Sequence, residues 1–211
     1  MKKYEKTGYL HHDFKIFHLT DHEMSAYDFH YHDFHKLLFF LSGNVTYCIE
    51  GKSYQLTPGD LVLVRAGEVH RPVIHDTTPY ERMIIYVSPD FAVTSSDKTI
   101  FLNQCFLPDA AMPSNVLHLS GMKERRLLDT MMELVHSFSE DSFANEIYQN
   151  TLFLEFMIHL NRAALSGTLQ YEDSFQANEK ILSVLTYMNE HLTEDITVDS
   201  PAEHFLPAAI I

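Results

Sequence analysis

The stretch that decides the fold is Phe29-His30-Tyr31-His32-Asp33-Phe34-His35-Lys36, which runs into the apolar segment Leu37–Leu41 and ends at Ser42-Gly43-Asn44. Its first two histidines stand two residues apart, and on a β-strand such side chains project to the same face. An apolar run closed by a glycine-containing turn is typical of a strand. The stretch therefore predicts a strand that aims two imidazoles at one point inside a β-domain.

Further short, β-rich runs surround this stretch from Phe14 to about Val87, and turn residues separate them. The strongest are Leu37–Leu41, Val45–Ile49, Tyr54–Leu56, Leu61–Val64 and Met83–Val87. Short strands between frequent turns are typical of an antiparallel sandwich or barrel. Because runs 37–41 and 61–64 are apolar almost throughout, we expect strands covered on both faces, in a closed or nearly closed β-domain.

After Pro89 the pattern changes to an irregular connection over residues 90–120, with a short helix expected near Ile100–Cys105, and then becomes helical. Ser120 is the expected cap of a first helix, and Gly167 the expected stop of a second. Their apolar residues recur at helical spacing and are Leu127, Leu128, Met131, Leu134, Val135 and Phe138, then Ile147, Leu154, Met157, Ile158 and Leu165. This hairpin either packs only on itself and the barrel or leaves apolar surface for a partner chain.

The last part of the chain reads as a polar linker over 168–177, a third helix from Asn178, and a short fourth one. Ser200-Pro201-Ala202-Glu203 has the form of a capping box with proline at the first helical position, and Pro207 stops this helix after scarcely two turns. The pattern indicates an interrupted domain.

Composition and charge exclude several classes of protein. The chain has 15 basic and 29 acidic residues in 211, a formal net charge of −14, which disfavours binding to nucleic acid by this chain alone. The two cysteines, Cys48 and Cys105, form neither a disulfide framework nor a zinc knuckle, which favours a reducing compartment. No segment is apolar enough to cross a bilayer, so we expect a cytoplasmic protein without membrane contact.

A third histidine joins the pair at 30 and 32. Pro58-Gly59-Asp60, a strand and Ala66-Gly67-Glu68-Val69-His70 place His70 on a neighbouring strand. Three imidazoles at one point either line a polar pocket or form a site for zinc or nickel. Both interpretations remain open on spacing alone.

At this point the sequence resembles a known family. Residues 29–43 and 58–72 are similar to the two cupin motifs, and in detail to the amino-terminal sensing domain of AraC-family transcription regulators. The helical hairpin and residues 179–205 resemble the dimerisation helices and the first part of the DNA-binding region of that family. The resemblance implies an α+β fold, in which a double-stranded β-helix (cupin) barrel precedes a dimerisation hairpin and the incomplete start of a helix-turn-helix domain.

The same resemblance implies three divisions of the chain. Residues 1–95 are expected to form the sensing barrel, residues 96–170 the connection and hairpin, and residues 171–211 the linker and first helices of the DNA-binding domain. From Ala163 onward there is one basic residue, Lys180, against eight acidic ones. DNA is therefore an expected partner only in a full-length form.

Two residues depart from the family pattern. In cupins that hold a metal, a glutamate occupies the position of Lys36, and Arg65 replaces the proline of the second motif. An ammonium roughly 5 Å from a divalent cation, at an effective dielectric constant of about 20, repels it by about 7 kcal/mol. We therefore expect no required cofactor, and only adventitious zinc or nickel at His30, His32 and His70. The positive side chains of Lys36 and Arg65 favour an anionic effector, unless Arg65 points out of the pocket.

The expected function is the effector-sensing and dimerising part of a regulator, without enzymatic activity, which binds a sugar or a sugar acid as a homodimer. The candidate ligand-binding residues are His30, His32, Lys36, Tyr47, Arg65 and His70. The candidate dimerisation residues are Leu127, Met131, Leu134, Leu154, Met157 and Ile158. The alternative is a metal-dependent cupin enzyme, an isomerase or a dioxygenase, with a three-histidine site.

Overall fold

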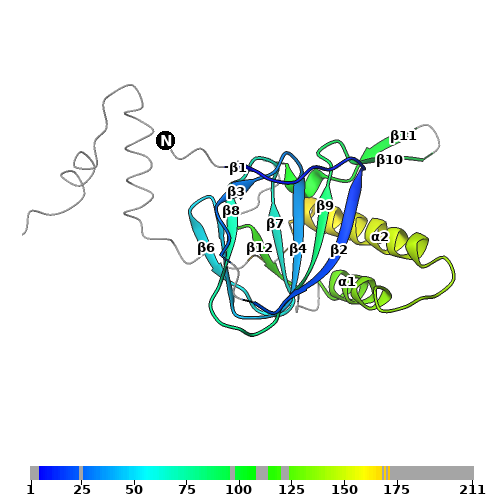
Figure 1. Ribbon diagram of the computed structural model, residues 1–211. Coiled ribbons are helices and arrows are strands. Elements are labelled where there is room, and N and C mark those ends of the chain that lie inside the picture. Colours follow the sequence, from blue (N-terminus) through cyan, green and yellow to red (C-terminus); the bar gives the residue numbers. More distant parts are fainter. Residues whose placement is uncertain are drawn as a thin grey trace, which may run out of the picture.

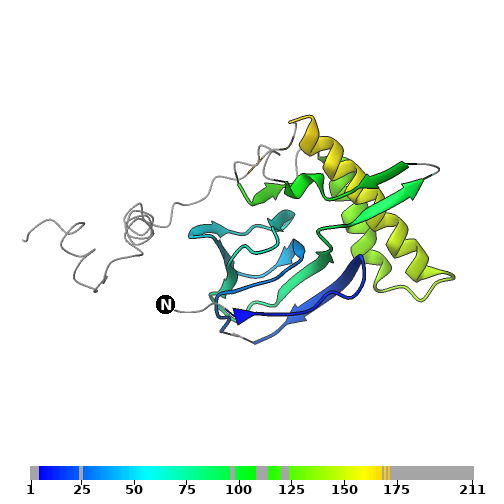
Figure 2. The same cartoon turned by 90° about the horizontal axis from the view of Figure 1, so that it is seen from above.

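Two β-sheets face each other, and two helices cover the outer face of one of them (Figures 1 and 2). The structure is a computed structural model, and it describes residues 5–23, 26–95, 98–107, 114–119, 124–167, 169 and 171. The third helix expected from Asn178 and the capping box at Ser200 lie outside these residues. Among the described helices, none is long and apolar enough to span a bilayer.

Each of the two facing sheets has five strands. The first sheet runs in the order β1 (Glu5–Lys6), β3 (His30–Tyr31), β8 (His70–Ile74), β5 (Val45–Ile49) and β6 (Lys52–Gln55). The second sheet runs in the order β12 (Val116–His118), β7 (Asp60–Val64), β4 (His35–Ser42), β9 (Tyr80–Val87) and β2 (Phe14–Asp21).

The pairing of strands β2 to β9 is nested. β5 pairs with β6, β4 with β7, β3 with β8 and β2 with β9, each time antiparallel. The chain therefore forms one long hairpin that is wound into two sheets, which is the topology of a double-stranded β-helix or jelly roll. The expected α+β fold with a cupin barrel is confirmed, and so are the five strand runs on which it was based.

The second sheet separates two apolar clusters, because its side chains alternate between its faces. In β4, Lys36 lines the barrel interior and Leu38 belongs to the interior cluster. Leu37 and Phe39, which alternate with them, belong to the cluster that the helices cover. The interior of the barrel and the helix interface are therefore two separate environments on one sheet.

The connection after the barrel differs from the sequence prediction. Instead of a helix near Ile100–Cys105, β10 (Ala92–Ser95) and β11 (Lys98–Phe101) form a two-stranded ribbon, and only Gln104–Phe106 makes a 3-10 turn, η1. The prediction was wrong because β-branched residues face each other across the ribbon, where Val93 pairs with Ile100. The partners in each pair lie on different strands, and a local helical pattern does not reveal such pairing.

The helices are α1 (Arg125–Ser137) and α2 (Asn145–Leu165), packed against each other and the sheet. Ser166 follows α2, and Gly167 adopts a φ of 65°, so the predicted stop is confirmed. The N-cap residue of α1 is Glu124, without a capping side-chain hydrogen bond. The predicted cap at Ser120 lies outside the described residues.

The candidate dimerisation residues divide into two groups. Leu127, Met131, Leu134 and Met157 are buried in the apolar core of this chain, so their assignment to a contact with a partner has to be corrected. These four side chains already pack against the sheet and the other helix. Leu154 and Ile158, in contrast, line an apolar groove of about 440 Å³ between α2 and the ribbon.

Candidate ligand-binding pocket

The barrel interior contains a cavity of about 490 Å³. This volume lies within the range of about 300–1,000 Å³ that small-molecule sites occupy. Residues from both sheets line the cavity, together with Thr7, Gly8 and the segment 26–29. Its polar lining side chains include His30, His32, Lys36, Tyr47, Tyr80, Arg82 and Tyr86.

Three histidines form a cluster at this cavity, of which His30 and His32 line it. His30 on β3 stands directly opposite His70 on β8, and His32 follows two residues after His30. The ring centroids are 4.5 Å apart for His30 and His70, 5.0 Å for His32 and His70, and 5.1 Å for His30 and His32. One nitrogen of each ring lies within 4.8 Å of the others. The structure thus brings these three predicted site residues together.

Main-chain carbonyl oxygens fix the protonation of all three rings. The Nδ1 atoms of His30, His32 and His70 lie 2.8, 2.5 and 3.0 Å from the carbonyl oxygens of Asp28, Thr7 and Glu68. Because a carbonyl oxygen only accepts hydrogen bonds, each Nδ1 carries the proton and donates it. The Nε2 atom of each neutral ring is therefore an acceptor.

Burial keeps these imidazoles uncharged. It lowers the pKa of His32 to about 4 and that of His70 to about 2, while the neighbouring Lys36 contributes in the same direction. The pKa of His30 is lowered for the same reasons. The Nε2 atoms of His32 and His70 are buried, and within the described part of the chain neither has a hydrogen-bond partner. The cavity therefore offers the unused acceptor of His32, and His70, whose ring belongs to the same cluster, does not itself line the cavity.

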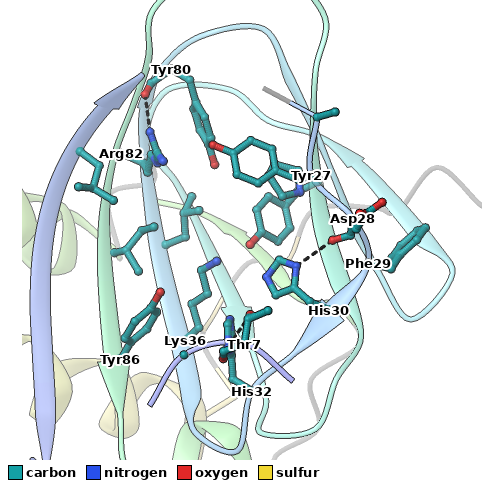
Figure 3. A pocket seen from close by; sticks show the side chains of 17 residues that line it. Thr7, Tyr27, Asp28, Phe29, His30, His32, Lys36, Tyr80, Arg82 and Tyr86 are labelled. Carbon is teal, nitrogen blue, oxygen red and sulfur yellow. Dashed lines mark hydrogen bonds between the residues drawn. The ribbon is translucent and has the colours of Figure 1, made fainter. Parts of the chain in front are cut away.

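Lys36 extends its ammonium group into the same cavity (Figure 3). The residue is only 6% exposed, and Nζ lies 5.6 Å from the centroid of the Tyr47 ring. Burial lowers the pKa of Lys36 to about 7, and the charge of Arg82 adds to this effect. Across the residues that the structure describes, no carboxylate forms an ion pair with it.

A second cation of the cavity, Arg82, was missed by the sequence analysis. Its guanidinium forms an ion pair with Asp21 at 2.7 Å, and the Tyr27 hydroxyl donates to the same carboxylate at 2.9 Å. Burial alone raises the pKa of Asp21, but the hydrogen bonds from Arg82 and Tyr27 outweigh it, so the pKa is lowered. The signal in the sequence was an arginine that alternates with Ile84 and Tyr86 on a largely apolar strand.

The two remaining candidate residues lie in different environments. Tyr47 is fully buried in the cavity wall, and its hydroxyl oxygen has no hydrogen-bond partner among the described residues. Arg65 does not line the cavity. It follows Val64, which stands opposite Lys36, so the alternation of the strand turns Arg65 to the other face of the sheet, near His35. The outward alternative for Arg65 therefore agrees with the structure.

The three imidazoles are suited to bind a transition-metal ion, whereas the neighbouring Lys36 is not. Neutral rings with Nδ1 bound to carbonyl groups and Nε2 bare are the usual form of histidine metal ligands. Lys36 places an ammonium where a carboxylate would complete the ligand set, and its charge opposes a divalent cation. Zinc or nickel would therefore be held by His30, His32 and His70 alone, and no protein carboxylate would neutralise the charge of the metal.

Comparison with known proteins relates the chain to transcription regulators. A family model described as the AraC-like ligand binding domain matches residues 13–157. The transcriptional activator RhaS of Enterobacter sp. (strain 638) is 24% identical over 186 residues, and that of Citrobacter koseri is 25% identical over 187 residues. Each alignment covers 86% of this chain and 62% of the relative, so the chain spans less than two thirds of the length of these relatives.

Among solved structures, a cupin family protein from Methanocaldococcus jannaschii with a double-stranded β-helix fold is 16% identical. The alignment has a TM-score of 0.33 and covers 36% of this chain and 70% of that protein.

Proposed function

The chain belongs to the AraC-like ligand binding domain family, and from this premise we propose that it senses a small-molecule effector for a transcription regulator. The observation that carries this proposal is the cavity inside the barrel, whose polar atoms are buried and in part unused. Relatives named as transcriptional activators support it and do not favour the alternative of a metal-dependent enzyme. DNA is a partner of the full-length form.

The proposed effector is a sugar or a sugar acid. A hydroxyl group of such a molecule donates to the bare Nε2 atom of His32, which lines the cavity and has no partner among the described residues. Tyr27 and Tyr86 supply aromatic surface for the apolar face of a sugar ring. A polyhydroxy ligand therefore matches both the polar and the apolar parts of the lining.

A thermal-shift screen of sugars and sugar acids tests this function. A ligand at a hundredfold its Kd stabilises the protein by about 2.7 kcal/mol, which for a chain of this size raises Tm by about 5–10 °C. The variant His32→Leu removes one acceptor and should lose the shift, whereas His12→Leu, which changes an exposed histidine outside the cavity lining, should retain it. Absence of any shift across the panel would contradict the proposal.

In its proposed role the protein needs no resident metal, and added zinc or nickel binds only weakly. The reason is the repulsion between Lys36 and a divalent cation at the three imidazoles. Titration calorimetry with zinc sulfate should therefore show at least tenfold tighter binding to Lys36→Gln than to the unchanged protein. Equal affinities would show that Lys36 does not govern metal binding.

The proposed regulator also forms a homodimer, through the groove between α2 and the ribbon. Leu154, Ile158 and Leu165 from α2 meet Ile100 and Phe101 from β11 there, and four of these five side chains are well exposed. Such an apolar surface is typical of a contact between chains. Sedimentation equilibrium should show dimers that Ile158→Glu disrupts, whereas Met132→Glu, at an exposed position of α1 outside this groove, should leave them intact.

A further inference from the structure

Lys36 is a buried cation whose counter-charge is missing from the cavity. Burying a charge costs much free energy unless an opposite charge or hydrogen bonds compensate for it. The described cavity lining contains one acidic residue, Asp28, which is exposed and does not affect the pKa of Lys36. Asp21 is already paired with Arg82. In its protonated form Lys36 thus places one uncompensated positive charge in the cavity.

This placement is unusual for a chain with 29 acidic and only 15 basic residues. Two of its cations, Lys36 and Arg82, are more than nine-tenths buried, and both line this cavity. Arg82 is held by Asp21 at 2.7 Å and donates to the carbonyl oxygen of Tyr80 at 2.9 Å. Lys36 has no ion pair or hydrogen bond within the described residues, so its whole charge is available to a ligand, whereas Arg82 keeps only its Nε–H group unused.

The unused polar groups of the cavity, Lys36 included, divide into hydrogen-bond donors and acceptors. Lys36, the Tyr47 hydroxyl and Nε of Arg82 are donors, and Nζ of Lys36 lies 5.6 Å from the centroid of the Tyr47 ring. His32 offers an acceptor, because its Nδ1 atom already donates to a carbonyl group. Lys36 and His32, one donor and one acceptor, both line the space shown in Figure 3. A complementary ligand therefore needs an acceptor of negative charge together with hydroxyl groups that donate.

On the premise that the cavity is the effector site, we infer that the effector carries a carboxylate that pairs with Lys36, while one of its hydroxyl groups donates to His32. The effector class is then a polyhydroxy acid, such as a uronate or an aldonate, rather than a neutral sugar. Hydrogen bonds between an ammonium and a carboxylate are roughly twice as strong as neutral ones, so Lys36 would select the acid over its neutral counterpart.

Titration calorimetry on matched pairs of compounds tests this inference. D-Galacturonate is compared with D-galactose, and D-gluconate with D-glucitol, because each pair differs in the carboxylate while retaining most hydroxyl groups. The proteins are the unchanged chain, Lys36→Met, which removes the ammonium and keeps the side-chain length, and Lys98→Met, which removes an exposed ammonium on β11.

We expect one of the acids to bind at least tenfold more tightly than its neutral partner. Lys36→Met should reduce this ratio to about one, and Lys98→Met should leave it unchanged. Neutral compounds that bind as tightly as the acids would overturn the inference and leave the sensing function intact. If neither class binds to the unchanged protein at millimolar concentration, the sensing of sugars and sugar acids fails as well. The comparison on the unchanged protein does not depend on the folding of any variant.

Discussion

The two faces of the second sheet show how one set of strands serves two purposes. On the side of α1 and α2, Leu37, Phe39 and Ile85 pack into a continuous apolar core. On the side of the barrel interior, the alternating residues include Lys36, Arg82 and Tyr86, which surround a cavity. Alternate residues of the same strands therefore contribute to stability on one face and to the cavity on the other. Substitutions on the two faces should therefore differ in what they change.

Truncation of a large side chain on the helix face should have the greatest effect. Phe153 is fully buried between Phe14 and Phe91, with ring centroids at 4.3 and 5.7 Å. We expect Phe153→Ala to reduce the free energy of unfolding by about 4 kcal/mol, because it leaves an unfilled cavity in the core. Urea denaturation measures this change. The control Phe143→Ala alters a fully exposed phenylalanine and should cost less than about 0.5 kcal/mol.

Removal of the charge on the cavity face should increase the stability of the protein, in contrast to the truncation on the helix face. Lys36→Met retains the apolar part of the side chain and removes a buried ammonium without an acidic partner. We expect the ligand-free protein to gain about 2 kcal/mol of stability at pH 7, because folding of the variant no longer has to bury a charged lysine or remove its proton. Differential scanning calorimetry would show a higher Tm. A lower Tm would mean that Lys36 has a stabilising partner, and the contrast between the faces would be lost.

A histidine on the helix face should make stability dependent on pH. His35 stacks on Phe106 with ring centroids 4.2 Å apart, and its Nδ1 accepts from the Ala66 amide. Burial, assisted by the charge of Arg65, lowers the pKa of His35 to about 4. Below pH 6.5 the unfolded chain takes up a proton that the folded protein does not, so stability falls with falling pH until about pH 4.

The expected contribution of His35 is about 1 kcal/mol between pH 7 and pH 5.5. Urea denaturation at pH 7 and pH 5.5 gives the loss of stability between the two pH values. This loss should be smaller by about 1 kcal/mol in His35→Gln than in the unchanged protein. The exposed His12 supplies the control, since His12→Gln should retain the full difference. If the pH dependence of His35→Gln equals that of the unchanged protein, His35 does not titrate as described.

The smallest effect is expected for Arg65, which was predicted to reach the ligand and instead lies on the helix side. Arg65→Ala should leave the affinity for the best ligand of the thermal-shift screen within twofold, because the side chain is absent from the cavity lining. Titration calorimetry would detect a larger change. A tenfold loss would place Arg65 in the binding site and contradict the assignment of the two faces.

Much of the barrel could be predicted from local sequence. The apolar runs bounded by glycine turns mark β4, β5 and β7, and the spacing of His30 and His32 places both imidazoles on one face. Their meeting with His70 followed from the similarity to the cupin motifs. These features depend on neighbours in the chain or on a familiar motif, so periodicity and turn chemistry are sufficient to find them.

The contacts that complete the pocket depend instead on residues far apart in sequence. Asp21 and Arg82 meet because β2 pairs with β9, and no local pattern shows that pairing. The apolar residues at helical spacing predicted α1 and α2 correctly. Their spacing does not distinguish a helix face that packs on the sheet from one that is exposed. Met157 is buried and Ile158 is exposed although both were assigned to the same surface.

The proton positions in the cavity are set by main-chain oxygens at residues 7, 28 and 68. Every amino acid supplies such an oxygen, so the side chains at these three positions can diverge during evolution while the rings keep presenting the same lone pairs. Kinship between pockets of this type is therefore better judged from backbone geometry than from residue identity at the supporting positions. Thr7 illustrates the point, since its carbonyl group orients an imidazole 25 residues further along the chain.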